Sequence, residues 1–398
     1  MRAFTILRIL ALLFMVAPQA AQACTSAIIS ADMNPYGRPL LWKHRDTSTT
    51  DNKVEYIPAR NGDYSYVALF NAKDKSLEQA WMGMNDVGFA IMNTASYNIK
   101  DDKVANSKMD REGYLMTKAL KKCKTVEDFA RLLETLPRPM GVEANFGVID
   151  AGGNGAFFET NNHSYKRYDL KDAENGVLVR TNYSHSGRKG EGYGYVREAN
   201  AEHLLAPYIA EKAVTAEVLT EVVSRSFYRD KEKRDFSGDL LVVDDDFIPR
   251  YKSTATIVIE GCVPVENMEL LKSGDMTDEY IMWTGIGYPP CAEIIPVYCS
   301  PEGVASELRG LAPNGHSALG DKVKARRNEV FVTKKGDKRK YVDMRKLFNE
   351  EGTGYVQVLT KKNRETYRQH RKPPKASAKS PLEANEMSAL EAQRSKSE

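Results

Sequence analysis

The order of strand-like and helix-like segments is the feature that most limits what this chain can fold into. Short apolar runs bounded by Gly, Pro and Asn are typical of strands, and apolar residues spaced three or four apart are typical of helices. Here strands come in runs, separated by helices, rather than in alternating strand–helix units. This order predicts an α+β fold in which helices cover sheet faces. The predicted strands are 25–30, 40–44, 54–57, 64–70, 88–93, 145–149, 155–159, 176–181, 253–260, 280–285 and 294–298, and the predicted helices are 111–122, 126–136, 196–208 and 216–224, the first two paired over the first sheet.

The first 23 residues have the layout of a secretory signal peptide. Arg2 and Arg8 precede the apolar run 9–16, and the segment ends with Ala21-Gln22-Ala23, which fits an A-x-A cleavage site. The apolar run is much shorter than the roughly 20 residues that a membrane-spanning helix needs. We therefore expect an exported protein, periplasmic or extracellular, without a transmembrane segment, whose mature chain begins at Cys24.

Composition and charge divide the rest of the chain. We expect one domain over 24–360 after the signal peptide 1–23, followed by a basic, mostly disordered tail over 361–398, which is rich in Lys, Arg, Ser, Pro and Glu. The chain has 57 Lys and Arg against 54 Asp and Glu, and two of the excess positive charges lie in the signal peptide. A mature chain so close to neutrality gives no reason to expect a nucleic-acid partner.

The cysteines do not form a metal-binding pattern. Cys262, Cys291 and Cys299 are predicted to be core thiols or members of a structural disulfide, Cys123 lies on one face of the predicted helix with Leu115 and Ala119, and the total of five leaves at least one thiol free. The sequence contains neither C-x-x-C nor H-E-x-x-H. We therefore expect no metal and no organic cofactor.

Cys24 is unusual because signal cleavage after Ala23 would give it a free α-amine. An α-amine and a thiol have ordinary pKa values of about 8 and 8.5, so one residue could supply both nucleophile and base. The alternative is acylation of Cys24 in a lipoprotein, which would block both groups. That pattern calls for a branched or Leu side chain three residues before the cysteine, where this chain has Ala21. Ordinary cleavage with a free Cys24 is the favoured interpretation.

Motifs along most of the chain resemble the choloylglycine hydrolase and penicillin acyltransferase group of N-terminal-nucleophile hydrolases, especially the carcinine hydrolase or isopenicillin-N acyltransferase-like branch. The resemblance covers roughly 24–298 and implies a four-layer αββα sandwich with two stacked antiparallel sheets. It also allows for a homo-oligomer. The motifs are Cys24-Thr-Ser, Leu41-Trp-Lys-His-Arg-Asp46, Gly83-Met-Asn-Asp-Val-Gly88, Asn145-Phe-Gly-Val-Ile-Asp150, Gly155-Ala-Phe-Phe-Glu-Thr160, Arg180-Thr-Asn-Tyr183, Gly194-Tyr-Val-Arg197 and Met282-Trp-Thr-Gly-Ile-Gly-Tyr-Pro-Pro290.

The resemblance assigns roles to four catalytic residues. Cys24 would be the nucleophile and its α-amine the base, and Asp46 matches the carboxylate that holds this amine. Asn182 matches an asparagine whose side-chain amide donates to the oxyanion. Arg197 is the candidate for an arginine that the group carries later in the chain.

Two further residues are predicted to contact the substrate. A backbone N–H near Asn93 is the candidate for the second oxyanion donor. Lys43 stands where relatives that cleave bile salts carry arginine. Lysine keeps the charge but loses the planar fork of donors, so we expect a different acyl or amine group to be bound.

The predicted function is an exported amidohydrolase that cleaves a linear amide bond, non-peptide or small-peptide, through a thioester on Cys24, with a small-molecule amide as its partner. Two alternatives remain open at this point. One is an acyltransferase that passes the acyl group to an amine, and the other is a lipid-anchored binding protein without catalysis. His44, His185 and His316 also allow a Cys–His mechanism, which a chain with its own amine does not need.

Overall fold

The computed structural model describes residues 23–371, and two antiparallel sheets form its centre. One sheet has seven strands in the order β3-β4-β5-β6-β7-β8-β9, so each strand pairs with its neighbour in sequence. The other has six strands in the order β10-β1-β2-β14-β15-β16 and joins the start of the domain to its later part. Their bounds are β1 Ala23–Ile29, β2 Leu40–Asp46, β3 Asn52–Ile57, β4 Tyr66–Asn71, β5 Met82–Asn85, β6 Ala90–Ala95, β7 Ala144–Ile149, β8 Gly155–Thr160, β9 Tyr165–Asp169, β10 Val177–Arg180, β14 Ser253–Glu260, β15 Ile281–Ile286 and β16 Ile295–Val297.

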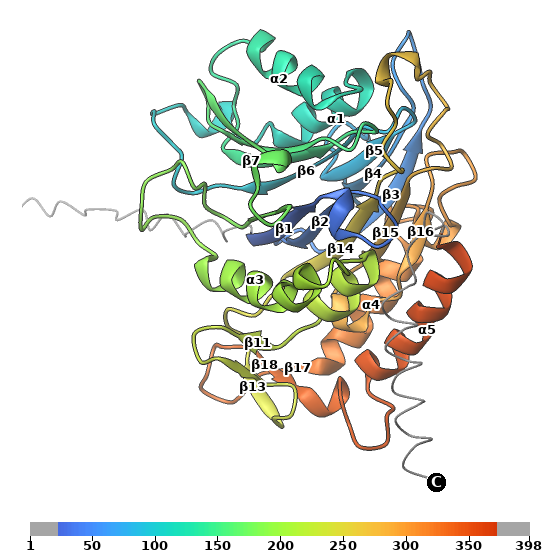
Figure 1. Ribbon diagram of the computed structural model, residues 1–398. Helices are drawn as coiled ribbons and strands as arrows, with labels where there is room; N and C mark the ends of the chain where they lie inside the picture. The colour runs from blue at the N-terminus through green and yellow to red at the C-terminus, as the bar shows by residue number, and fades with distance from the viewer. Residues whose placement is uncertain (1–22, 372–398) are drawn as a thin grey trace, which may run out of the picture.

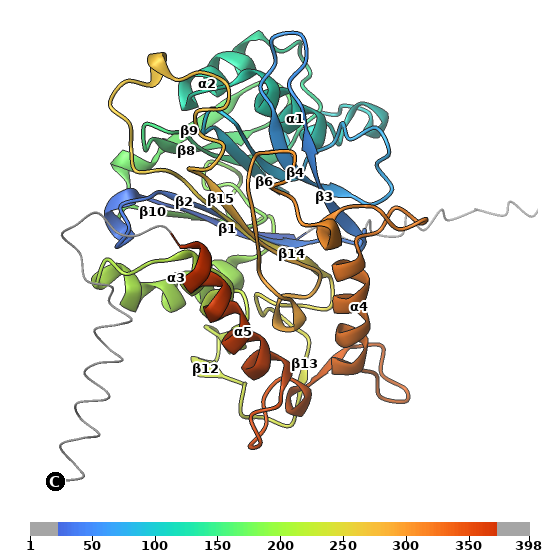
Figure 2. The ribbon, with the colours of Figure 1, turned by 90° about the vertical axis from the view of Figure 1, so that its right-hand side faces the viewer.

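Helices cover the outer face of each sheet and complete four layers (Figure 1). Helices α1 and α2 lie over the seven-stranded sheet, where α1 packs on β5 and β6. Helices α3, α4 and α5 lie on the far side of the six-stranded sheet (Figure 2). Helix α3 packs against β10 and β1, α4 against β15, and α5 against β16. The predicted α+β fold with four αββα layers is therefore confirmed. The helix bounds are α1 Glu112–Lys122, α2 Val126–Thr135, α3 Tyr195–Ala210, α4 Ala318–Val330 and α5 Tyr355–His370, with a π-helix at Val218–Val223.

Short strands beyond the two main sheets lie below the α3 layer in Figure 1. They form a three-stranded sheet in the order β13-β18-β17 and a two-stranded pair, β11-β12. Within residues 23–371, none of the helices combines the length and apolar character that crossing a membrane requires. The bounds of the short strands are β11 Tyr228–Arg229, β12 Arg234–Asp235, β13 Leu241–Val243, β17 Phe331–Val332 and β18 Tyr341–Asp343.

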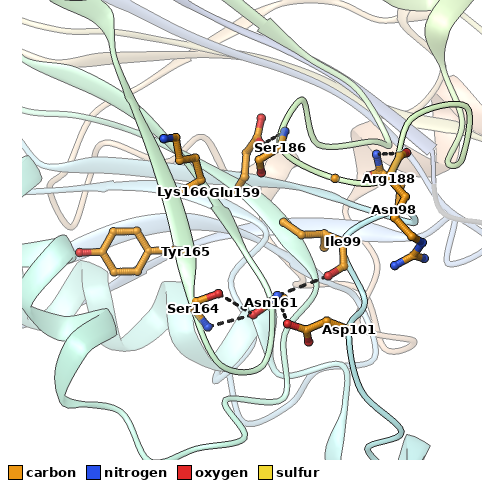
Figure 3. A pocket seen from close by; sticks show the side chains of 11 residues that line it. Asn98, Ile99, Asp101, Glu159, Asn161, Ser164, Tyr165, Lys166, Ser186 and Arg188 are labelled. Carbon is orange, nitrogen blue, oxygen red and sulfur yellow. Dashed lines mark hydrogen bonds between the residues drawn. The ribbon is translucent and has the colours of Figure 1, made fainter.

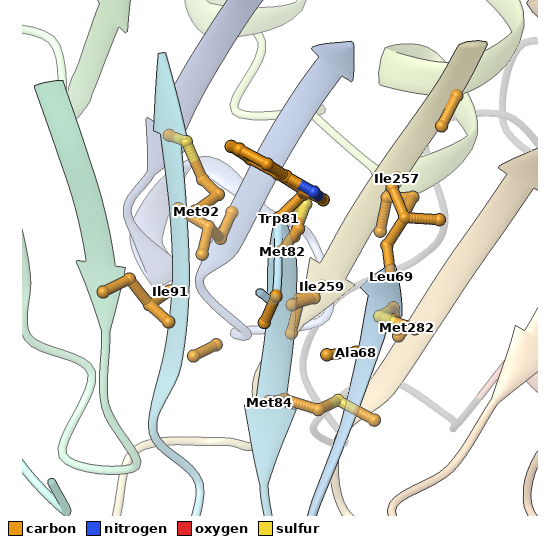
Figure 4. Close-up of a cluster of buried hydrophobic side chains, with 14 of the residues drawn as sticks. Ala68, Leu69, Trp81, Met82, Met84, Ile91, Met92, Ile257, Ile259 and Met282 are labelled. Carbon is orange, nitrogen blue, oxygen red and sulfur yellow. The ribbon is translucent and has the colours of Figure 1, made fainter. Parts of the chain in front are cut away.

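The larger hydrophobic core fills the space between the two sheets and continues beneath α1 and α2. Figure 4 shows side chains of β4, β5 and β6 meeting those of β14 and β15. A second core, which includes Trp42, Trp283 and Tyr367, lies between the six-stranded sheet and the helices below it. The six-stranded sheet is thus buried on both faces, which explains why β1 and β2 contain buried residues only.

Side-chain alternation in β1 and β2 decides which way each residue of the predicted site faces. Ile28 and Leu41 are paired across the strands and belong to the core between the sheets. Ala27 and Trp42, one position along, belong to the core on the helix side. Because the period of a strand is two, Cys24, Lys43 and Arg45 face the other sheet, whereas Thr25, His44 and Asp46 face the helices.

All five cysteines are free and buried. The prediction of core thiols is therefore confirmed for Cys262, Cys291 and Cys299, the structural disulfide is not formed, and Cys123 is a core thiol as well. Burial raises the pKa of the Cys123 thiol to about 12 and that of Cys262 to about 11.

The domain extends past its predicted end at residue 360. Helix α5 continues to His370, its residues Asn363 and Tyr367 are buried, and the Tyr367 ring packs at a tilt against Trp283, with 4.5 Å between the ring centroids. The prediction of a disordered tail is therefore wrong for 361–370. The rest of that tail, 372–398, and the predicted signal peptide up to residue 22 lie outside the described residues.

Candidate active site

The backbone nitrogen of Cys24 is held by Asn182. Strand β10 pairs with β1 so that Arg180 lies opposite Ser26, and this register brings Asn182 opposite Cys24. The Cys24 nitrogen donates to Asn182 Oδ1 at 2.7 Å, while Asn182 Nδ2 donates to the Ala95 carbonyl at 2.9 Å. Ala23 precedes Cys24 in the described chain, so this nitrogen belongs to a peptide bond. The role of Asn182 as an oxyanion donor stays a prediction, since its amide NH2 here contacts Ala95.

Arg197, from the first turn of α3, binds the same two residues. It donates to the Cys24 carbonyl at 2.5 Å, to Thr25 Oγ1 at 3.0 Å and to Asn182 Oδ1 at 2.8 Å. Only 1% of its surface is exposed, and burial lowers its pKa to about 10, which leaves it charged at neutral pH. The structure therefore brings Cys24, Asn182 and Arg197 together, as the sequence motifs suggested.

Gly194 allows Arg197 to take this position. It precedes α3 with φ of +97°, a backbone conformation that side chains disfavour. A Cβ at this position would lie 2.5 Å from Arg197 Nη2 and 2.7 Å from Thr181 Oγ1. The positive φ and the close approach of Arg197 and Thr181 thus explain why the Gly194-Tyr-Val-Arg197 motif begins with glycine.

Asp46 lies opposite Ala23 in the β1–β2 pairing, directly across from the residue before Cys24. Its carboxylate accepts hydrogen bonds from Arg250 and from Ser253 Oγ at 2.6 Å, and His44 Nε2 lies 3.4 Å away. Burial would raise the pKa of Asp46, but Arg250, followed by His44, holds it well below its usual range. The site thus contains a permanently ionised carboxylate beside the predicted cleavage point.

Sequence reasoning missed Arg250 and Ser253. They lie about two hundred residues after Asp46 and reach it because β14 pairs with β2, with a register shift at Ser253. Neither belongs to a motif that the sequence analysis singled out. Strand pairing over such a separation left no local signal.

Lys43 extends from the six-stranded sheet to the other sheet. Its Nζ donates to the Trp81 carbonyl and to Asn93 Oδ1, both at 2.8 Å. Burial lowers the pKa of Lys43 to about 7, with a further contribution from Arg45 that the Cys24 thiol opposes. The two predicted substrate-binding residues, Lys43 and Asn93, are therefore in direct contact, and their role toward a substrate stays a prediction.

Buried basic side chains dominate the electrostatics around Cys24: Arg45, Arg197 and Arg250 are charged at neutral pH, whereas Lys43, with a pKa of about 7, is protonated only in part. Lys43 and Arg45 lie on its inter-sheet side, Arg197 and Arg250 lie on the helix side, and the pKa of each responds to charge on Cys24. Asp46 is the carboxylate that directly contacts Arg250. Such a positive field suits the negative charge that develops on a carbonyl oxygen under attack.

The three histidines considered earlier pair with oxygen atoms. His44 binds Ser253 Oγ at 2.8 Å, His185 binds Glu198 at 2.7 Å, and His316 binds Asp321 at 2.9 Å. Two groups in the described part of the chain offer enough ligand atoms for a metal ion: Asp51, His316 and Asp321, and Asp101, Asp102 and His163. Neither group includes a residue of the candidate site.

Two cavities are lined in part by the loop that follows β6. Figure 3 shows one of about 410 Å³, lined by residues that include Asn98, Glu159 and Arg188. The other, of about 540 Å³, is lined by Trp81, Asn93 and Ala95 among others. The second adjoins the site, because Trp81 and Asn93 bind Lys43, and Ala95 binds Asn182.

Solved structures with a similar arrangement are distant in sequence. An N-acylethanolamine-hydrolyzing acid amidase ortholog from Caenorhabditis elegans is 15% identical, with a TM-score of 0.39 over 62% of this chain and 95% of its own. A mutant of conjugated bile acid hydrolase from Clostridium perfringens is 13% identical, with a TM-score of 0.41 over 69% and 92%. Penicillin V acylase from Agrobacterium tumefaciens is 12% identical, with a TM-score of 0.36 over 69% and 86%. Comparison with curated proteins gives no match.

The sequence itself matches one family profile, which describes acyl-coenzyme A:6-aminopenicillanic acid acyl-transferases. The match runs over 38–248, more than half of the chain, and includes Asp46, Asn182 and Arg197. The chain belongs to this acyl-transferase family of N-terminal-nucleophile hydrolases.

Proposed function

We propose that this protein is an exported amidohydrolase that cleaves a linear amide bond of a small molecule through a thioester on Cys24. The observation that carries the proposal is the hydrogen bond from the Cys24 nitrogen to Asn182, within a buried group that also contains Arg197. A cysteine that served only to fill the core would not need a buried asparagine on its backbone nitrogen and a buried arginine on its carbonyl. Membership of the family supports action on a C–N bond.

The chemistry begins with cleavage of the peptide bond between Ala23 and Cys24, which turns the Cys24 nitrogen into an amine. Asn182 Oδ1 would then accept a hydrogen bond from this amine, and Asp46 would lie close to it, since Asp46 pairs with Ala23 across the strands. Export by signal cleavage is the step that would produce this terminus. A periplasmic or extracellular location belongs to the same proposal.

In the reaction, the amine accepts the thiol proton while Sγ attacks the carbonyl carbon of the amide. The positive field of Arg45 and Arg197, joined by Lys43 when it is protonated, would stabilise the oxyanion that forms. The ammonium then gives its proton to the departing nitrogen, the C–N bond breaks, and the acyl group remains on Cys24 as a thioester. Water, deprotonated by the same amine, attacks the thioester and releases the carboxylic acid and the free thiol.

An acyltransferase is the second candidate, because the matched family is named for acyl transfer. The same thioester would be attacked by an amine instead of water, with every residue above in the same role. The two candidates differ in the partition of the acyl-enzyme. Acid release that persists in the presence of excess amine supports the hydrolase, whereas quantitative formation of a new amide supports the transferase.

The deciding experiment combines the intact mass of the exported protein with turnover of a panel of acylated amines and N-acyl amino acids. We expect a free Cys24 terminus, and we expect Cys24→Ser to fold but to lose turnover. Cys123→Ser is the matched control, because Cys123 is equally buried but lies on the far side of the seven-stranded sheet, under α1 and α2. A diacylglycerol adduct would instead support the lipid-anchored binding protein, and unchanged turnover in Cys24→Ser would reject the thioester.

A further inference from the structure

The cavity of about 540 Å³ beside the site has the size of a small-molecule pocket. Its wall is formed by the loop after β6, the start of α1 and the residue before β7, and it reaches Trp81 and Asn93 on the opposite side. Since these two residues hold Lys43, a molecule in the cavity would lie next to the predicted reaction centre. The cavity is therefore the natural place for part of the substrate.

The wall of this cavity carries an excess of negative charge. Three carboxylates line it, those of Asp110, Glu112 and Glu143, against one ammonium, that of Lys100. Lys100 Nζ lies 3.8 Å from Glu143 Oε1, beyond hydrogen-bond distance, and this buried oxygen has no hydrogen-bond partner within residues 23–371. One lysine at that distance leaves the wall with a net negative charge, even though Glu112, with a pKa of about 7, is partly protonated at neutral pH.

The two glutamates of this wall have raised pKa values, and burial is the main cause for both. Burial raises the pKa of Glu112 to about 7, and Asp110 and Glu143 push it in the same direction. Burial also raises the pKa of Glu143, against the opposite effect of Lys100. A cation placed among these groups would relieve both the desolvation and the mutual repulsion.

Trp81 supplies a second, independent sign of a ligand. Trp81 is one of the residues that line the cavity, it is 8% exposed, and its indole N–H finds no acceptor in the described part of the chain. A buried donor without a partner is unfavourable, by about 1–3 kcal/mol, until a ligand provides an acceptor. The residues that line the cavity thus include one with an unpaired indole donor and three with carboxylates.

We propose that this cavity binds an amide substrate that carries an ammonium group, recognised by Asp110, Glu112 and Glu143, with Trp81 donating to an acceptor of the same molecule. The inference rests on the proposed function, because it assigns the cavity to the substrate of Cys24. The substrate is a cation, and the experiment below decides whether its ammonium is on the acyl side or the amine side of the amide.

The experiment compares matched amides that differ in one terminal group. On the acyl side, 5-aminopentanoyl, hexanoyl and adipoyl anilides present an ammonium, a methyl group and a carboxylate. On the amine side, hexanoyl amides of 1,5-diaminopentane and of hexylamine present an ammonium and a methyl group. We expect one ammonium amide to exceed its methyl counterpart in kcat/KM by about tenfold or more, and the carboxylate amide to be the poorest of its series. Equal values within both series would overturn the proposal.

Variants locate the selectivity in the cavity wall. Glu143→Gln and Glu112→Gln, which keep an oxygen acceptor, should each lower the ratio of kcat/KM between ammonium and methyl amides by about fivefold. Glu174→Gln, at an exposed position between β9 and β10, is the matched control and should leave the ratio unchanged. Ratios that stay constant in both cavity variants would contradict recognition by this wall.

Binding to Cys24→Ala, measured by calorimetry with the same amides, separates this inference from the proposed function. If Cys24→Ala binds an ammonium amide preferentially but the wild-type protein cleaves none of these amides, the result would contradict the amidohydrolase and support ammonium recognition in the cavity. Turnover of methyl and ammonium amides alike, with equal binding to Cys24→Ala, would support the amidohydrolase and overturn the cavity.

Discussion

Lys43 gives the sharpest test of the site, because its burial sets the direction in which stability changes with pH. The side chain is 3% exposed and has a pKa lowered from 10.5 to about 7, mainly by burial. In the unfolded chain it returns to water and to its ordinary pKa. Between pH 7 and pH 10.5 the unfolded state therefore binds a proton that the folded state does not.

This difference makes the folded state gain stability as the pH rises through that window. The slope of the free energy of unfolding follows the number of protons bound in the unfolded state minus the number bound in the folded state, which here is positive. With folded and unfolded pKa values of about 7 and 10.5, the gain between pH 7 and pH 9 is about 2 kcal/mol. Below pH 7 both states are protonated, and the full penalty of burying the charge remains.

The perturbation is Lys43→Met, which puts an unbranched apolar side chain one atom shorter in place of the lysine and removes the titration. Urea unfolding, followed by tryptophan fluorescence at pH 7, 8 and 9, gives the free energy of unfolding of both proteins, and all three tryptophans are buried reporters. We expect the parent to gain about 2 kcal/mol relative to Lys43→Met over this range, whatever the offset between them. The exposed Lys75→Met should run parallel to the parent. Parallel curves for the parent and Lys43→Met would refute the assignment of a neutral buried lysine.

Three further substitutions test the neighbouring contacts. Arg250→Met leaves the buried Asp46 carboxylate without its charged partner and should lower the free energy of unfolding by about 3 kcal/mol, measured by urea titration; a loss below about 0.5 kcal/mol would contradict a buried ion pair. Glu112→Gln removes a carboxyl group whose pKa is raised to about 7. The parent should lose about 3 kcal/mol of unfolding free energy as the pH rises from 4.5 to 7, and the variant should not show this loss. A variant with the same pH profile as the parent would reject the raised pKa. Gly194→Ala should lower the free energy of unfolding by about 2 kcal/mol and reduce turnover. Gly336, with φ of +80° and open space around it, is the control: Gly336→Ala should lower the free energy of unfolding by about 1 kcal/mol and leave turnover intact. Equal losses would show that the close approach at Gly194 is easily relieved.

Local patterns predicted much of the fold, and the exceptions have physical reasons. Strands of the two central sheets alternate or are continuously apolar because both sheets are covered, so nearly all of them were found. Helix α5 was assigned in part to a disordered tail because its exposed face is dense in Lys and Arg. Its buried residues Val356, Leu359, Asn363 and Tyr367 nonetheless recur at helical spacing. The helical periodicity was therefore present in the sequence, but Asn363 is polar and Tyr367 is amphipathic, so the apolar pattern was weak.

The site was predictable where its residues lie within motifs and unpredictable where strand pairing assembles it. Cys24, Asn182 and Arg197 came from short motifs, and the structure brings them into contact. Arg250 reaches Asp46 only through the pairing of β14 with β2. Glu143 lines the same cavity as Asp110 and Glu112, although helices α1 and α2 separate it from them in the sequence. Contacts of this kind depend on sheet order, which the chain does not encode locally.

The two-residue period of β1 and β2 also bears on the choice between mechanisms. Cys24 faces the space between the sheets with Lys43, whereas His44 and Asp46 face the helices, so the six-stranded sheet separates the thiol from the nearest histidine and carboxylate. A Cys–His pair would need both side chains on one face. The backbone nitrogen of Cys24 lies in the plane of the sheet, at the start of its strand, where groups from both faces can approach it. A base built from that nitrogen is therefore compatible with this register, and a base built from His44 is not.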